Sequence, residues 1–304
     1  MQGFHRPHEV CECRPASACH TIRGDHFPGD TIPMSIEFTT PPAEGCIDTQ
    51  VIGEVLLIGI NRPAKRNGWT PAMFHQLAAA YTRLDAEPAL RVGVLHAAGA
   101  HFTGGLDLPI VSEYLKAGGK LIPEGLQDPH DFGTPGHPRR NKPVVAAVKG
   151  ICFTVGIELM LGADVVVAAD DCRFSQKEVQ RGLMAGGGAT LRFAERAGMG
   201  NAMLLLLTGD EFGSAEAFRM GFVQKVVPAG GELEEALAIA QRIAAQAPLA
   251  VIATRLNVIK CIEQGQAAAV ADFDAIAQRM LASEDLAEGV RSFIEKRPAR
   301  FTGR

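Results

Sequence analysis

The sequence lacks a strong excess of either charge. Its 30 lysine and arginine residues face 34 aspartate and glutamate residues, which leaves a formal net charge of −4 at pH 7. A nucleic-acid-binding protein usually carries a basic surplus on one face, so the composition gives no global electrostatic support for a nucleic-acid partner. The balance of charges excludes no small ligand.

An apolar run long enough to cross a membrane is also missing. The longest candidate, residues 155–169, is interrupted by Glu158 and Asp164, whereas a spanning helix needs about 20 predominantly apolar residues. The N-terminus has no apolar segment of the kind found in a secretory signal. We therefore expect no membrane partner and a cytoplasmic location.

Cysteines are few and odd in number, which argues against a disulfide framework in a chain of this size. The seven cysteines fit a reducing compartment better. Three of them occur in "CEC" and "ACH", in a segment that also holds His5, His8 and His26. The paired C-x-x-C spacing of a zinc module is absent there, so we expect no metal site and no separate cofactor.

The first 33 residues differ in character from the rest of the chain. They are rich in His, Cys and Pro, show neither helical nor strand periodicity, and are followed by a second methionine, Met34. Such a segment is typical of a disordered extension or of a start codon placed too early. We assign residues 1–33 to that extension.

What the chain does contain is a strong core pattern, with 47% hydrophobic and 21% charged residues. Short apolar runs predict buried strands, and they lie at residues 54–63, 91–99, 142–150 and 163–170. Thr70 and Pro71 are a good N-cap and first residue for a helix between the first two runs. Strands alternating with helices indicate an α/β fold with a parallel sheet covered on both faces.

Two further stretches complete the coarse prediction. Between residues 110 and 141 the periodicity fades into a segment dense in Gly, Pro and charge, which predicts a long loop. From residue 231 onward the pattern is helical, with an acidic start and with Pro248 ending the first helix. The stretch from 249 to 295 is expected to be rich in helix.

Several familiar nucleotide and nucleophile motifs are absent. The chain has no G-x-x-x-x-G-K-[ST] phosphate loop, although "AGGGAT" superficially suggests one. It has no G-x-G-x-x-G after a strand with a suitably placed acidic residue, and no G-x-S-x-G nucleophile elbow. Kinase-like, dinucleotide-binding and serine-hydrolase chemistry therefore find no support.

Three other stretches have the composition of a reactive site. In "HFTGGLDL", the adjacent Gly104 and Gly105 allow a turn that exposes backbone N–H groups, and Asp107 is placed to cap the next helix; an ordinary strand-to-helix turn would look the same. In "FTVGIELML", Gly156 opens a helix directly after a strand, and a helix N-terminus stabilises an anion. Glu158 and Glu178 place carboxylates near buried segments, where a charge needs a partner or a proton; a helix-dipole role is the plainer interpretation of Glu158.

Taken in order, the motifs resemble the crotonase superfamily, the enoyl-CoA hydratase/isomerase group. The resemblance covers residues 54–301 except for the loop near 112–140, and it rests on the ordered set "INRPAKRN", "HFTGGLDL", "KPVVAAVKG", "VGIELMLGADVVVAA", "FSQKEV", "GGGATLRF", "LLTGDEFGSAEAFRMGFVQKVVP" and "SEDLAEGVRSFIEKRPARFTG". It implies a ClpP/crotonase spiral of ββα units at 34–230 and a helical trimerisation region at 231–304. A homotrimer, or a homohexamer built from two trimers, is then expected.

The resemblance also implies an acyl-CoA thioester as substrate, with coenzyme A as part of it. By motif position, the backbone N–H groups of Leu106 and Val155 form an oxyanion hole for the thioester oxygen, a contribution typically worth about 10²–10³ in rate. Further contacts to the substrate or to coenzyme A are expected at Arg62, Ala64, Lys65, Arg66, Gly104, Gly105, Asp107, Leu108 and Gly156. The C-terminal "FIEKRPARF" is expected to reach the adenine held by a neighbouring subunit.

Glu158 and Glu178 match the two acidic positions that hydratases of this family use. Two carboxyl groups in a semi-apolar pocket can divide the work of holding water and moving protons, because repulsion and desolvation push their pKa values apart. Hydration of a trans-2-enoyl-CoA, the reaction of a lyase, is the function implied. Which glutamate is protonated stays open, as do isomerisation, hydrolysis, decarboxylation and a catalytically silent acyl-CoA-binding role.

The chain departs from the family pattern at four places. Its "TVG" replaces a triple glycine before Glu158, and Lys177 replaces a proline before Glu178, where it either lowers the pKa of Glu178 or points to solvent. Gly186 stands where dienoyl-CoA isomerases carry an aspartate, which argues against that reaction. The Gly/Pro-rich loop at 122–138 replaces a helix that lines the acyl pocket, so acyl specificity is left undefined.

Overall fold

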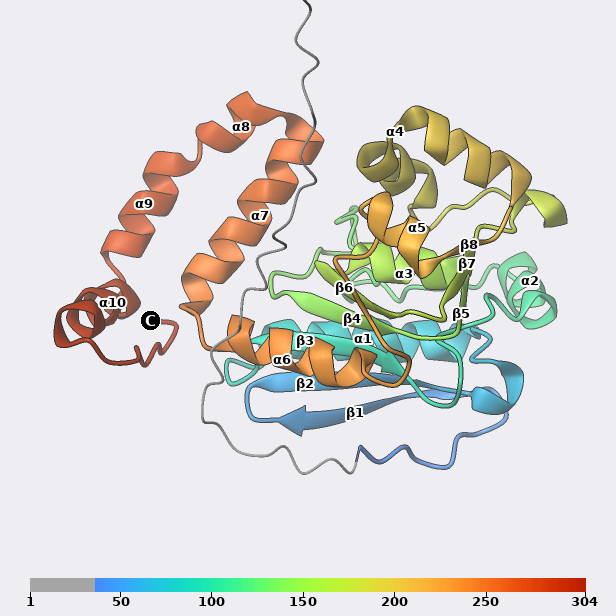
Figure 1. Cartoon of the computed structure of the whole chain (residues 1–304), viewed down its shortest axis with the longest axis horizontal. Helices are drawn as coiled ribbons and strands as arrows, with labels where there is room; N and C mark the ends of the chain where they lie inside the picture. Colours follow the sequence, from blue (N-terminus) through green and yellow to red (C-terminus); the bar gives the residue numbers. More distant parts are fainter. Residues whose placement is uncertain (1–35) are drawn as a thin grey trace, which may run out of the picture. The chain divides into compact units, whose positions relative to one another are not determined.

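A six-stranded sheet forms the centre of the protein. The computed structural model describes residues 36–304, and the extension with its cysteines and histidines lies outside the described residues. The strand order is β1-β2-β3-β4-β6-β9 (Figure 1). The bounds are Cys46–Ile52 for β1, Val55–Asn61 for β2, Val92–Ala97 for β3, Val144–Val148 for β4, Val165–Ala169 for β6 and Lys225–Val227 for β9.

The four predicted strands are confirmed as β2, β3, β4 and β6. Within the six-stranded sheet, the edge strand β1 runs antiparallel to its neighbour and the other strands run parallel. β1 pairs antiparallel with β2 across a tight turn at Gly53, whereas β2, β3, β4, β6 and β9 are parallel neighbours. Every residue of β2, β3 and β4 is buried. Such continuous apolar strands are expected where helices cover both faces of a sheet.

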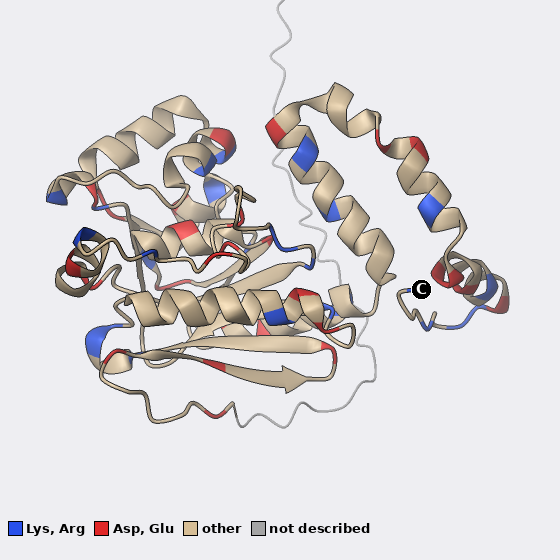
Figure 2. Ribbon diagram, turned by 180° about the vertical axis from the view of Figure 1, so that it is seen from behind, with Lys and Arg blue, Asp and Glu red and all other residues tan. Residues whose placement is uncertain are grey.

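Two helices cover the opposite faces of this sheet. Helix α1 (Pro71–Ala86) begins at the predicted Thr70 N-cap, whose side chain accepts from the Met73 N–H at 3.4 Å. Helix α6 (Glu232–Ala244) lies across β3, β4 and β6. Figure 1 shows α6 in front of the sheet, and Figure 2, seen from behind, shows α1 in front. The fold class is therefore α/β, and α6 packs on the sheet although the sequence places it in the C-terminal helical region.

A second, three-stranded sheet was not predicted. Its strands β5 (Ile151–Phe153), β7 (Arg173–Ser175) and β8 (Phe212–Gly213) follow the order β5-β7-β8. The prediction that a helix directly follows the third apolar run is therefore wrong, because β5 intervenes before helix α3 (Val155–Gly162). Three-residue strands are too short to produce a periodic signal.

The long-loop prediction needs a similar correction. Helix α2 (Leu108–Lys116) occupies the first part of it, with Pro109 in its first turn, and the irregular chain runs only from 117 to 143. Beyond the second sheet lie helix α4 (Ala189–Thr208), kinked at Gly198, and helix α5 (Ser214–Arg219). The glycines of "AGGGAT" form the turn that leads into α4.

The C-terminal part is helical, as predicted. Its helices are α7 (Pro248–Gln264), α8 (Gln266–Val270), α9 (Phe273–Leu281) and α10 (Glu284–Glu295), drawn from orange to red in Figure 1. Across residues 36–304, no single helix has the length and apolar character to cross a bilayer; only the pair α6 and α7, bent by 109°, passes by length and composition together.

Candidate active site

The Gly-rich turn after β3 presents a free backbone donor. The Trp69 N–H donates to the Gly105 carbonyl and the Asp107 N–H donates to the Trp69 carbonyl, each at 2.9 Å. These two hydrogen bonds flank Leu106, and the Leu106 N–H has no acceptor among the described residues. Gly105 has φ of 110°, a conformation that only glycine adopts readily. The turn therefore exposes one N–H donor, at the position that the sequence predicts for the oxyanion hole.

The second predicted donor lies at the start of helix α3. Val155 is the first residue of the helix, so its N–H has no partner within the helix. The preceding residue, Thr154, has φ 52° and ψ −120°, a strained conformation for a β-branched residue. Its hydroxyl is buried and has no hydrogen-bond partner among the residues described.

The two donor-bearing turns are in direct contact. A β-carbon on Gly105 would lie 2.4 Å from the Thr154 hydroxyl oxygen, so only glycine permits this approach. The loop before Leu106 and the loop before Val155 are thus held side by side. Two free N–H groups on adjacent turns, one of them at a helix N-terminus, form the type of site that stabilises a developing oxyanion.

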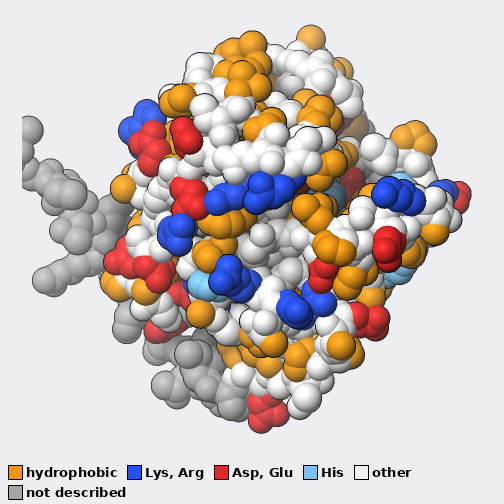
Figure 3. All heavy atoms as spheres, turned by 90° about the vertical axis from the view of Figure 1, so that its right-hand side faces the viewer, with side chains coloured by type: hydrophobic (Ala, Val, Ile, Leu, Met, Phe, Trp, Pro, Cys, Tyr) orange, Lys and Arg blue, Asp and Glu red, His pale blue; other side chains and the backbone are white. Residues whose placement is uncertain are grey.

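A groove runs past these turns. Its inner cavity, of about 160 Å³, is lined by Gly104, Leu106, Leu108, Phe153, Thr154, Lys177, Glu178, Arg181 and Leu183. An outer cavity of about 230 Å³ shares Gly104, Leu106 and Phe153 with it and adds Lys65 and Arg66. Figure 3 views the molecule from its right-hand side in Figure 1 and shows Lys and Arg side chains gathered around a hollow. The inner cavity combines apolar side chains with Lys177, Glu178 and Arg181, and Lys65 and Arg66 border the outer cavity.

Glu178 faces the inner cavity in an environment that favours its neutral form. Burial, reinforced by the charge of Glu158, raises the pKa of Glu178 to about 7. When the Gln176 amide is oriented with its nitrogen towards Glu178, it lies 3.0 Å from both carboxyl oxygens. Glu178 is therefore held in place and close to half-protonated at neutral pH.

Glu158 has a different environment: it lines neither cavity, although its charge acts on Glu178. It lies in the first turn of α3, is only 5% exposed, and accepts a hydrogen bond at 3.3 Å from the N–H of Ala189, the first residue of α4. The N-termini of α3 and α4 thus both lie beside its carboxyl group. The two glutamates therefore have different surroundings: backbone N–H groups beside Glu158, and the wall of the inner cavity around Glu178.

Two of the predicted basic contacts remain available for a ligand. Lys65 ends the short 3₁₀ helix Pro63–Lys65, Arg66 follows it with φ 49°, and both are exposed at the outer cavity. Ala64 lies between Pro63 and Lys65 and is exposed as well, but it does not line either cavity.

The prediction that Arg62 binds phosphate stays a prediction. The side chain is 6% exposed, and its Nε and Nη1 donate to the Ala43 and Gly68 carbonyls at 2.9 Å and to Asp107 at 2.8 Å. These bonds brace the turn that bears Leu106, and Arg62 also lines the outer cavity. Asp107 precedes α2 at the N-cap position, yet its carboxylate pairs with Arg62 rather than capping the helix.

The structure distinguishes between the remaining predicted contacts. Leu108, the first residue of α2, lines the inner cavity. Gly156 is buried away from both cavities; a β-carbon there would lie 2.4 Å from Thr103 Cγ2, so it allows α3 to approach the turn after β3. Lys177 pairs with Glu211 at 2.7 Å and lies 4.4 Å above the Phe153 ring. It is not among the causes of the Glu178 pKa shift.

Sequence reasoning missed two polar groups at this site. The Thr154 hydroxyl could not be predicted as part of the site, because its position depends on an unusual backbone conformation. His130 lies within "DPHDF" in the loop at 117–143, a stretch without periodicity, and only tertiary contacts bring it to Glu158.

Comparison with known proteins identifies the family. The sequence model described as enoyl-CoA hydratase/isomerase matches residues 51–304. The chain is similar to a mevalonyl-coenzyme A hydratase of Beauveria bassiana, with 36% identity over 80% of this chain and 89% of the relative. It is also similar to an enoyl-CoA hydratase of Mycobacterium tuberculosis, with 33% identity over 83% of this chain and 94% of the relative.

The fold comparison agrees with the sequence comparison. The crystal structure of a probable enoyl-CoA hydratase/isomerase from Mycobacterium abscessus superposes with a TM-score of 0.81 and 42% identity, covering 85% of this chain and 98% of that one. Sequence model, relatives and fold agree, and the chain belongs to the enoyl-CoA hydratase/isomerase family.

Proposed function

We propose that the protein adds water across the double bond of a trans-2-enoyl-CoA and releases a 3-hydroxyacyl-CoA. The observation that carries the proposal is the pairing of two carboxyl groups in contrasting environments, beside two free backbone N–H groups. The names of the relatives, a mevalonyl-coenzyme A hydratase and an enoyl-CoA hydratase, support the same reaction class.

The proposed mechanism assigns a different role to each glutamate. The N–H groups of Leu106 and Val155 hold the thioester oxygen. The carboxylate of Glu158 accepts a proton from water as the water oxygen bonds to C3, and the π electrons move onto the thioester as an enolate. Glu178, neutral, then donates its proton to C2, which collapses the enolate. Each acid–base step is worth about 10²–10⁴ in rate.

The basic rim of the groove suits the phosphates of coenzyme A. Lys65 and Arg66 border the outer cavity, and their charged groups can contact a pyrophosphate or ribose phosphate. No separate cofactor is required by this mechanism. We further propose a trimeric or hexameric assembly and a cytoplasmic location, in keeping with the family resemblance.

The test is hydration of crotonyl-CoA, followed by the loss of absorbance of the conjugated thioester. Glu158→Gln and Glu178→Gln should each lower turnover by at least about 10²-fold, because glutamine keeps the size but exchanges no proton at neutral pH. The dissociation constant for butyryl-CoA should change little, since the oxyanion donors are backbone groups. Near wild-type hydration by either variant would end the two-glutamate hypothesis. Loss in only one variant would favour isomerase or hydrolase chemistry.

A further inference from the structure

His130, in the loop at 117–143, is held on every side except one. Its ring Nδ1 lies 3.5 Å from Asp128 Oδ1, and the same oxygen accepts from the His130 backbone N–H at 2.8 Å. The His130 carbonyl accepts from the Arg192 guanidinium at 2.5 Å. The ring stacks on Phe132 at a centroid distance of 6.2 Å. These contacts fix the position of the ring.

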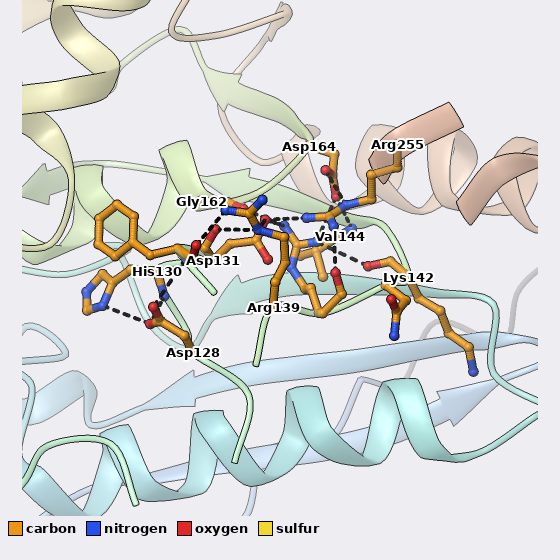
Figure 4. A network of polar contacts seen from close by, with 12 residues as sticks. Asp128, His130, Asp131, Arg139, Lys142, Val144, Gly162, Asp164 and Arg255 are labelled. Atoms are coloured by element: carbon orange, nitrogen blue, oxygen red, sulfur yellow. Dashed lines mark hydrogen bonds and ion pairs between the residues drawn. The ribbon is translucent and has the colours of Figure 1, made fainter. Parts of the chain in front are cut away.

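The loop itself is fastened to the body of the protein by buried charges. Asp131 pairs with Arg255 of helix α7 and lies 3.8 Å from Arg140, and Asp164 bonds Arg140 at 2.8 Å and Arg255 at 2.7 Å. Figure 4 shows Asp128 and His130 beside this cluster, on the same stretch of loop. The position of His130 is therefore fixed by a rigid support.

The one unsatisfied atom of His130 faces Glu158. Its Nε2 is buried and has no hydrogen-bond partner within residues 36–304. A β-carbon on Gly187 would lie 2.7 Å from this Nε2 and 2.6 Å from Glu158 Oε2, so both atoms lie against Gly187 and close to each other. No direct hydrogen bond or ion pair joins them. A buried nitrogen without a partner costs free energy unless a ligand or water supplies one.

We propose that His130 is a positioning residue that binds a hydroxyl group together with Glu158. Asp128 lies beside Nδ1, and the tautomer with its proton on Nδ1 would leave Nε2 as an acceptor. A hydroxyl that donates to Nε2 can present its oxygen to the reacting carbons. The hydroxyl comes either from the added water, whose two hydrogens can go to Nε2 and to Glu158, or from the acyl chain of the substrate, whose single hydrogen goes to Nε2. The inference rests on the proposed function of this site, because it places His130 beside the proposed catalytic residue Glu158.

Two substitutions at His130 separate the contact that its ring makes with Asp128 from the contribution of its Nε2 atom. His130→Asn keeps an amide N–H near Asp128 but removes the group at the Nε2 position, whereas His130→Gln places a polar group near Nε2. We expect His130→Asn to lower kcat/KM about tenfold to a hundredfold, the effect of one lost buried hydrogen bond. His130→Gln should recover at least half of that loss on a logarithmic scale. The thermal midpoint serves as the control for folding.

The source of the hydroxyl is distinguished by the substrate. An equal loss with crotonyl-CoA and with a 2-enoyl-CoA that carries a distal hydroxyl would identify the added water. A loss confined to the hydroxylated substrate would identify the acyl chain. Unchanged kcat/KM for both substrates in His130→Asn would overturn the proposal, as would equal losses in His130→Asn and His130→Gln.

A second pair of variants tests the contact that Glu158 and His130 share at Gly187. Gly187→Ala would place a methyl group against both Glu158 and His130, whereas Gly186→Ala, one residue earlier, has no neighbour closer than 4.0 Å. Gly187→Ala should lower kcat/KM at least tenfold, and Gly186→Ala should change it less than threefold. Similar behaviour of the two would count against the proposal.

A binding measurement keeps the inference separate from the proposed reaction. Wild-type protein should bind 3-hydroxybutyryl-CoA or a distally hydroxylated acyl-CoA more tightly than butyryl-CoA, and His130→Asn should reduce that preference. If wild-type protein fails to hydrate crotonyl-CoA, the proposed function fails, yet the binding preference still decides the role of His130. No preference for either hydroxylated ligand in the wild type would refute that role.

Discussion

At the scale of single residues, the chemistry depends on small departures from ordinary geometry. The two acidic positions could be singled out in the sequence, because glutamates are rare in apolar segments, and the family resemblance supplied their expected roles. Their opposite environments could not, because burial of Glu178 and the N–H of Ala189 beside Glu158 come from chain segments brought together by folding. The free Nε2 of His130 and the strained Thr154 are equally tertiary features.

Thr154 combines strain with an unsatisfied hydroxyl, so Thr154→Gly should stabilise the protein. Glycine tolerates φ 52° and ψ −120°, which relieves about 1–3 kcal/mol of strain, against about 0.5–1 kcal/mol of added chain entropy in the unfolded state. The free energy of unfolding in urea should rise by about 1 kcal/mol. Thr154→Ser, which keeps the hydroxyl and a side chain, should show no such gain. A less stable glycine variant would contradict the strain assignment.

The raised pKa of Glu178 predicts a pH dependence of stability. Its pKa is about 7 in the folded protein against an ordinary value of 4.5. Between these values the folded state holds more protons than the unfolded state, so the free energy of unfolding falls as pH rises through this window and levels off above it. Glu178→Gln lacks this slope. The free energy of unfolding of Glu178→Gln, taken relative to that of the wild type, should therefore increase from pH 4.5 to pH 8.

The measurement is urea denaturation of both proteins across that pH range. Parallel curves for wild type and Glu178→Gln would show that Glu178 titrates normally. The same variant pair gives a kinetic check, because a neutral Glu178 that donates its proton predicts a decline of kcat/KM above about pH 7.

At the scale of elements, long periodic segments were predicted well and short ones poorly. The strands β2, β3, β4 and β6 and the helices α1 and α6 carry clear apolar patterns, and each appears within a few residues of its expected bounds. β5, β7 and β8 have two or three residues, and α2 begins in a segment broken by Pro109. These short elements are stabilised by pairing with distant chain segments, which local sequence does not encode.

The buried ion cluster connects helix α7 to the loop that bears His130. Asp131 is 5% exposed and has φ 61°, so Asp131→Asn keeps a residue that tolerates this backbone and removes only the charge. Arg140 and Arg255 would then share Asp164 alone. We expect a loss of about 3 kcal/mol in the free energy of unfolding, since breaking a buried pair leaves charge uncompensated.

A more exposed pair on the same helix provides the control. Lys260 of α7 bonds Asp272 at 2.6 Å, with both side chains partly exposed. Asp272→Asn should cost less than about 1 kcal/mol. Equal costs for the two substitutions, measured by urea denaturation, would show that the buried cluster adds no special support. Asp131→Asn should also lower kcat/KM, because it loosens the loop around His130.

At the scale of the whole molecule, the order of motifs proved more informative than any single motif. Each stretch alone is compatible with an ordinary turn or helix, yet the ordered set predicted the α/β fold and the family, which the sequence and structure comparisons confirm. The assembly of several chains stays a prediction, since it depends on surfaces rather than on the core. The C-terminal helices expose large apolar side chains, and these offer a direct test.

The exposed apolar residues of α9 and α10 predict that the protein assembles through this region. Leu281 is 71% exposed, Phe293 85% and Ile294 72%. Exposed apolar side chains grouped on adjacent elements commonly mark an interface between proteins, and most oligomers of one chain close symmetrically. Sedimentation at micromolar concentration should therefore give a trimer or a hexamer.

Phe293→Asp should shift the protein towards monomer because a charge would be buried in the contact. Val51→Asp, at a 44% exposed position on the edge strand β1, should leave assembly unchanged. A wild-type monomer, or equal effects of the two substitutions, would show that α9 and α10 do not form the interface.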